Sequence, residues 1–64
     1  MRNTTMQNTK NTTMHFFIRR NGSAWAILDI DGEVLDSGFE SEAAAANFVV
    51  RFCQDHRMLY AIYY

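Results

Sequence analysis

The sequence has little of several features that define common protein classes. Among its 64 residues there is a single cysteine, Cys53. A lone cysteine excludes an internal disulfide, which favours a reducing compartment. No apolar run approaches the roughly 18 residues that span a bilayer, and the N-terminus lacks the apolar stretch of a signal peptide. We therefore expect a cytoplasmic protein without a membrane segment.

An excess of basic residues is also missing. The formal net charge is -1 and the isoelectric point is near 6.0, so strong attraction to nucleic acid or to an anionic membrane is not expected. Residues 21–50 contain no Lys or Arg, and the acidic residues in this window are Asp29, Asp31, Glu33, Asp36, Glu40 and Glu42. The basic residues all lie outside it, at Arg2, Lys10, Arg19, Arg20, Arg51 and Arg57.

No catalytic or cofactor motif stands out. There is no Gly-rich phosphate loop and no Ser–His–Asp or Cys–His–Asn grouping with a supporting context. Cys53 and His56 have i, i+3 spacing and His15 could be a third ligand, but a structural zinc site normally has four. The acids around Gly32 lack the spacing of a calcium loop. We expect a protein that is not an enzyme and has no metal or cofactor.

The length allows one small domain with a marginal core. Residues 1–13 are rich in Asn and Thr and predict a disordered polar tail, which leaves 14–64 as the domain. Met6 and Met14 are alternative start positions, and neither start would shorten the domain.

Two glycine turns organise the domain. Asn21-Gly22 and Asp31-Gly32 are strong hairpin signals, because these residues tolerate positive φ. They separate three strands, predicted over 15–20, 24–30 and 33–39. Gly38 predicts a bulge near the end of the third strand.

With two-residue turns, both faces of this sheet are largely apolar. One face carries Phe16, Ile18, Trp25, Ile27, Val34 and Asp36. The other carries Phe17, Ala24, Ala26, Leu28, Leu35 and Phe39. A three-residue loop at either turn would regroup these sets. In either register one helix can cover only one face, and the sequence does not indicate which.

That helix is predicted from Glu42 to about Asp55, with Ser41 as its N-cap. Its expected apolar stripe has i, i+3, i+4 spacing and consists of Ala45, Phe48, Val49, Phe52 and His56. No Gly or Pro marks its end. Residues 58–64 are rich in strand formers and predict a fourth strand parallel to the first, in the order 3-2-1-4. The alternatives are that they extend the helix or pair with a second copy.

The expected fold is therefore α+β, with a three-stranded antiparallel meander, one packed helix and a C-terminal fourth strand. Because a second apolar face remains, we expect a homodimer or a complex with another protein to cover it. The candidate partner-binding residues are apolar side chains on the face of Trp25, a common interface anchor, and the acids of the second turn and third strand. They are Phe16, Ile18, Trp25, Ile27, Asp29, Asp31, Glu33 and Asp36. The alternative for the Trp25 face is that it lies beneath the helix.

One segment resembles short units with a three-stranded sheet and a helix. It runs from Arg19 to about Phe52 and begins RRNGSAWAILDIDGEVLDSGFESEAAAANFV. Such units occur as the arm-type DNA-binding domain of phage integrases and as small bacterial and phage proteins. The resemblance implies a DNA-binding sheet with basic residues on its exposed face. This chain departs from that pattern because acids occupy its second turn, where they would repel phosphate.

The expected function is a non-enzymatic protein–protein interaction module, a small phage- or mobile-element-encoded regulator or inhibitor with an acidic surface. Its mobile-element origin rests on the resemblance alone. The alternative is a nucleic-acid-binding domain of the integrase arm type, which would use the tyrosines and Arg19, Arg20, Arg51 and Arg57. A small metal-dependent enzyme, a third possibility, would require bound metal.

Overall fold

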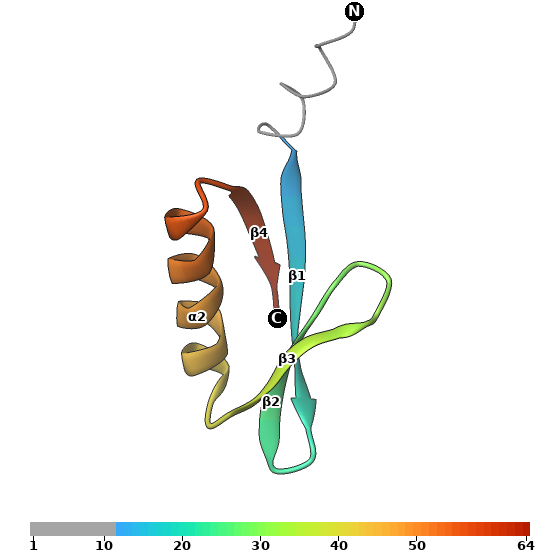
Figure 1. Ribbon diagram of the computed structural model, residues 1–64. Helices are drawn as coiled ribbons and strands as arrows, with labels where there is room; N and C mark the ends of the chain where they lie inside the picture. The colour runs from blue at the N-terminus through green and yellow to red at the C-terminus, as the bar shows by residue number, and fades with distance from the viewer. Residues whose placement is uncertain (1–11) are drawn as a thin grey trace, which may run out of the picture.

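The computed structural model describes residues 12–64. Its elements are β1 (Thr13–Asn21), β2 (Ala24–Leu28), β3 (Val34–Phe39), α2 (Glu42–Asp55) and β4 (Leu59–Tyr63). They form one four-stranded sheet in the order β3-β2-β1-β4, with α2 on one side of it (Figure 1).

The sheet is mixed. β1, β2 and β3 are an antiparallel meander, and β4 pairs with β1 in parallel, with Thr13 opposite Leu59 and Phe17 opposite Tyr63. The α+β class, the strand order and the C-terminal strand are thus confirmed. Thr13 belongs to β1, so the predicted tail reached too far at its end; its residues 1–11 lie outside the described part of the chain.

The first turn is shifted by one residue from the prediction. Asn21 pairs with Ala24, so the turn residues are Gly22 and Ser23 rather than Asn21 and Gly22. Gly22 has φ 68° and Ser23 keeps a negative φ, as a type II′ turn requires with glycine at its first central position. The pairing is shifted by one residue on each of the two strands. Both strands change together, so Phe16, Ile18, Trp25 and Ile27 still share a face.

The second turn is a longer loop than predicted. β2 ends at Leu28 and β3 begins at Val34, and the loop between them extends away from α2 (Figure 1). The Asp29 carboxylate accepts hydrogen bonds from the backbone N–H groups of Asp31 and Glu33, each at 2.9 Å. These side-chain bonds replace the ladder bonds of a tight hairpin, which is why the turn is wider.

β3 departs from regular pairing twice, and this regroups its side chains. Ladder irregularities occur between Trp25 and Ala26 and between Ile27 and Leu28 of its partner strand. Gly38, with φ 86°, lies at the first, as predicted for a bulge. Phe39 consequently packs on the core with Trp25, on the opposite face from that predicted.

The second irregularity also corrects two face assignments. Val34 now pairs with Leu28 on the face away from the helix, whereas it was predicted beside Ile27. Leu35 was predicted on the face opposite Phe16, yet it lines a hollow together with Phe16 on the helix side. An extra residue in one strand reverses the alternation beyond it, which is the physical reason for both errors.

Helix α2 begins as predicted and ends in a Schellman motif. Ser41 Oγ accepts from the Ala44 N–H at 3.0 Å. At the other end, the Met58 N–H donates to the Cys53 carbonyl and the Arg57 N–H donates to the Gln54 carbonyl. Arg57 adopts φ 55°, the left-handed conformation usually taken by glycine at this position. The helix therefore stops without Gly or Pro.

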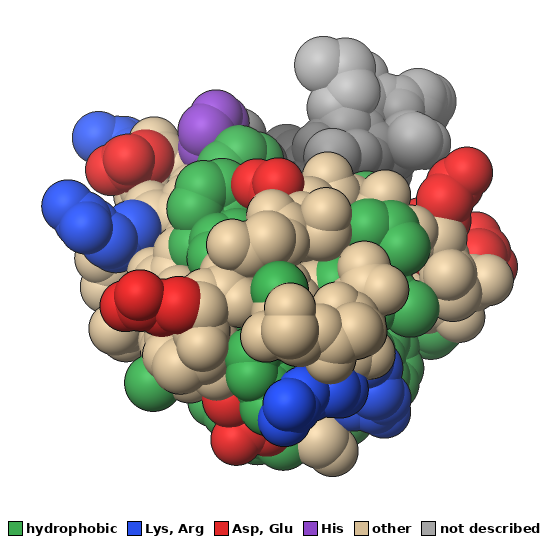
Figure 2. Space-filling view, turned by 90° about the horizontal axis from the view of Figure 1, so that it is seen from below, with side chains coloured by type: hydrophobic (Ala, Val, Ile, Leu, Met, Phe, Trp, Pro, Cys, Tyr) green, Lys and Arg blue, Asp and Glu red, His purple; other side chains and the backbone are tan. Residues whose placement is uncertain are grey.

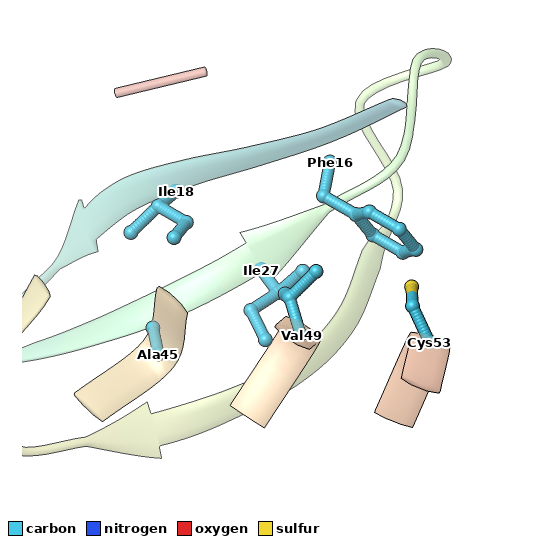
Figure 3. Close-up of a cluster of buried hydrophobic side chains, with 6 residues drawn as sticks. All are labelled: Phe16, Ile18, Ile27, Ala45, Val49 and Cys53. Atoms are coloured by element: carbon cyan, nitrogen blue, oxygen red, sulfur yellow. The ribbon is translucent and has the colours of Figure 1, made fainter. Parts of the chain in front are cut away.

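The core lies between α2 and the centre of the sheet. Phe16, Ile18 and Ile27 from the strands point toward the helix side chains Ala45, Val49 and Cys53, and all six are buried (Figure 3). The buried stripe has i, i+4, i+8 spacing. Phe48, Phe52 and His56, which were predicted to belong to it, are exposed instead, so the helix is rotated toward its smaller residues. Small side chains allow the helix to approach the sheet closely.

Candidate functional site

The apolar face predicted for docking is the one beneath the helix. Ile18 is 1% exposed, and Phe16 and Ile27 are also buried. They cannot reach a partner in this fold, which corrects their assignment as partner-binding residues in favour of the alternative stated for that face. Trp25 lies on the same face and is half-buried. The Arg20 guanidinium lies 5.3 Å from the centroid of the Trp25 ring.

The opposite sheet face is not covered by α2 and carries a row of stacked side chains, here called the sheet-face stack: His15, Phe17, Arg19 and Tyr63. The rings of Phe17 and Tyr63 are 4.7 Å apart with an interplanar angle of 18°. His15 stacks on Tyr63 at 5.7 Å, and its Nδ1 is hydrogen-bonded to the Tyr63 hydroxyl at 2.9 Å. The Arg19 guanidinium lies 5.5 Å from the Phe17 ring.

The stack depends on the parallel pairing of β1 and β4. Because Phe17 is opposite Tyr63 in the ladder, both side chains lie on the same face although they are far apart in the sequence. Apolar residues continue this face across β2 and β3, where Leu28 pairs with Val34 and Val34 is 53% exposed. The result is an uncovered surface with aromatic rings at β1 and β4 and the Leu28–Val34 pair at β2 and β3.

The predicted acidic residues lie in different places and differ in what they can do. The Asp29 carboxylate is engaged within its own loop by two backbone N–H groups. Asp31 and Glu33 are exposed in the same loop, next to Ile30, which is also exposed. Asp36 lies apart from them: its carboxylate accepts from the Ser37 N–H at 2.9 Å, and it lines a hollow on the helix side. The predicted acids therefore do not form one patch.

That hollow, the helix-side groove, has a volume of about 430 Å³. Its lining is apolar except for one carboxylate and comprises Met14, Phe16, Ile27, Leu35, Asp36, Phe48, Val49, Phe52 and Met58. Phe48 and Phe52, here called the aromatic ridge, are 43% and 40% exposed and stack at 6.3 Å. They also line a second hollow on the outer side of α2, which contains Arg51 and Asp55.

The arginines proposed for nucleic-acid binding are not brought together. Arg19 belongs to the sheet-face stack, Arg20 lies against Trp25, and Arg51 lines the outer hollow of α2. Arg57 forms the helix C-terminus. In the view of Figure 2, Lys and Arg side chains lie in separate areas, each with acidic side chains beside it. No single basic surface is visible on that side of the molecule.

The residues considered for a metal site are separated by the sheet and the helix. Cys53 is buried in the core, where burial raises the pKa of its thiol. His56 Nδ1 donates to the Phe52 carbonyl at 2.8 Å on the helix surface, and His15 is on the opposite face of the sheet. Within residues 12–64, no cluster of at least three His, Cys, Asp and Glu side chains is placed to hold a metal ion.

Sequence reasoning missed the sheet-face stack and the aromatic ridge. Tyr63 was considered as part of an edge strand or as a platform for stacking bases, and His15 only as a metal ligand. The available signal was the predicted 3-2-1-4 order, which fixes β4 beside β1 but not its register.

Among the described residues, no helix has the length and apolar character needed to cross a membrane. No protein family model, curated protein or solved structure matches the chain.

Proposed function

We propose that this protein is a non-enzymatic protein–protein interaction module that binds its partner with the uncovered face of the sheet. One observation carries the proposal: a single helix covers one face, and the other carries the sheet-face stack and the Leu28–Val34 pair. Exposed aromatic and aliphatic groups gain free energy when a partner removes them from water, and aromatic residues with an arginine are enriched at interface centres.

The charge around this face indicates the chemistry of the partner. Asp31 and Glu33 project from the β2–β3 loop at its border, with no cation in that loop. A partner with an apolar patch bordered by Lys or Arg fits this arrangement, because rim charges of opposite sign favour association and correct orientation. A regulator or inhibitor of a basic protein, encoded by a phage or other mobile element, remains the prediction for the biological role.

The experiment is affinity capture from native extract with the immobilised full chain. We expect Tyr63→Ser, and separately the double variant D31K/E33K, to reduce capture of the main partner at least about tenfold, equivalent to ~1.4 kcal/mol. Phe52→Ser is the matched control, since Phe52 and Tyr63 are both 40% exposed but lie on opposite sides of the molecule. Equal capture by all variants, or recovery of the protein alone, would contradict the proposal.

Nucleic-acid binding is the second candidate, and Arg19 beside stacked aromatic rings favours it. Bases stack on exposed ring faces, however, and here Phe17, Tyr63 and His15 cover one another's faces. This is why we rank it below protein binding. It predicts a salt-dependent rise in fluorescence anisotropy of a labelled single-stranded oligonucleotide, and capture that is lost after nuclease treatment of the extract. No anisotropy change at low salt would exclude it.

A further inference from the structure

We propose that a second copy of this chain occupies the helix-side groove, so that the protein forms a two-fold symmetric homodimer through α2. In this dimer the aromatic ridge of one protomer inserts into the groove of the other. The contact uses the helix side and leaves the uncovered sheet face accessible, so it is independent of the proposed partner-binding function.

The shape of this surface is self-complementary. The aromatic ridge projects from α2, and the groove of about 430 Å³ lies directly beside it between α2 and the sheet. A two-fold axis that runs between ridge and groove places each ridge opposite the partner's groove, as an isologous contact requires. The groove is lined by Met14, Leu35 and Met58 in addition to core residues, and flexible thioether side chains adapt well to an inserted ring.

The charges match in the same arrangement. Asp36 is the single ionisable group in the groove lining, and Arg51 lies in the hollow on the other side of the ridge. In the proposed dimer, Arg51 of one protomer pairs with Asp36 of its partner, twice per dimer. Asp55 shares the hollow with Arg51, so like-charge repulsion favours the register in which Asp36 faces the arginine.

A second copy fits better than the chain's own N-terminal segment. Residues 1–11 contain only Met1 and Met6 as apolar side chains, too few to fill an apolar groove of this size. The ridge supplies two neighbouring aromatic rings that are already ordered, because they stack on each other and make tilted ring contacts with Phe39 and His56. Little side-chain entropy is lost when such rings are buried.

The first test is sedimentation equilibrium of the full chain at tens of micromolar. We expect a dimer, and we expect Phe52→Ser to raise its dissociation constant at least about tenfold. Tyr63→Ser, with the same exposed fraction on the opposite face, should leave it unchanged. A wild-type monomer at these concentrations overturns the proposal, and so does a dimer that is lost in Tyr63→Ser but retained in Phe52→Ser.

The second test uses charge reversal and leaves the aromatic ridge intact. Arg51→Glu alone opposes two acids across the interface, and Asp36→Arg alone opposes two arginines, so each homodimer should weaken. An equimolar mixture of the two variants restores both opposite-charge pairs in the heterodimer. We expect native mass spectrometry to show the heterodimer in clear excess over both homodimers. A statistical distribution of species in the mixture overturns the proposed contact.

Discussion

Cys53 is a fully buried residue of α2 in the same core cluster as Phe16. It lies on the same side of the helix as Ala45 and Val49, because the three residues are four positions apart. Its thiol is surrounded by apolar side chains, so the thiolate form is disfavoured and the pKa is raised above its ordinary value of 9.0. The residue therefore acts as a small apolar side chain in the core. This role differs from the metal ligand considered from the sequence.

The raised pKa of Cys53 predicts a pH dependence of stability. The folded protein holds this proton more tightly than the unfolded chain, so the contribution is constant below pH 9 and is lost as pH rises above it. We expect the free energy of unfolding in urea to fall more between pH 8 and pH 10.5 for wild type than for Cys53→Ala. Parallel pH profiles for the two proteins would show that the thiol makes no such contribution.

Arg57 shows how an element can end against local preference. A non-glycine residue in the left-handed region costs about 1–2 kcal/mol, yet the Schellman bonds at this helix end hold Arg57 there. The chain must reverse at this point because β4 follows immediately beside β1. The strand pairing thus imposes a conformation that the residue would not adopt by itself.

Replacing Arg57 with glycine should relieve this strain. We expect Arg57→Gly to stabilise the protein by about 1 kcal/mol in urea unfolding, because glycine adopts positive φ without a Cβ clash. Arg51→Gly, the same substitution inside α2, should destabilise it by about 1 kcal/mol. Destabilisation by both substitutions would indicate that the Arg57 side chain makes a contact that outweighs its backbone cost.

Asp29 stabilises the β2–β3 loop through its side chain. Its carboxylate accepts from the N–H groups of Asp31 and Glu33, which fixes the loop before β3 begins. Asp29→Ala should destabilise the protein by about 1–2 kcal/mol, since it leaves two backbone donors without this acceptor. Asp31→Ala is the control, because its side chain is exposed in the same loop. Chemical denaturation of both variants measures the difference.

At the scale of the whole molecule, β4 contributes side chains to both faces of the sheet. It pairs with β1, places Ile62 against the core, and provides Tyr63 to the sheet-face stack. A chain of 64 residues has a small hydrophobic core, so the loss of one strand removes a large share of its buried surface. The last strand is therefore both a structural and a functional element.

Removing residues 59–64 should abolish cooperative unfolding. Without β4, Phe16 and Phe17 lose their neighbours Ile62 and Tyr63 on opposite faces of the sheet. Removal of Tyr64 alone, which lies beyond β4 and is 67% exposed, should leave the thermal midpoint within about 2 °C. Circular dichroism melting curves distinguish these results, and a sharp transition in the longer truncation would contradict the role assigned to β4.

The sequence by itself determined which elements form and their order. Alternating apolar residues, two glycine-containing turns, the Ser41 cap and the alanine-rich helix are local signals, and each acts through neighbouring residues. Strand topology followed as well, because a strand–helix–strand connection has few allowed arrangements. The sequence also indicated that one helix would leave one sheet face uncovered.

Only the tertiary structure decided which face that is and what it carries. The bulges of β3 moved Val34, Leu35 and Phe39 to faces opposite those expected, and packing rotated α2 so that its phenylalanines form a ridge. The register of β4 set Tyr63 beside Phe17. These outcomes depend on contacts between residues far apart in the chain, where close packing selects one arrangement among several that local preferences allow equally.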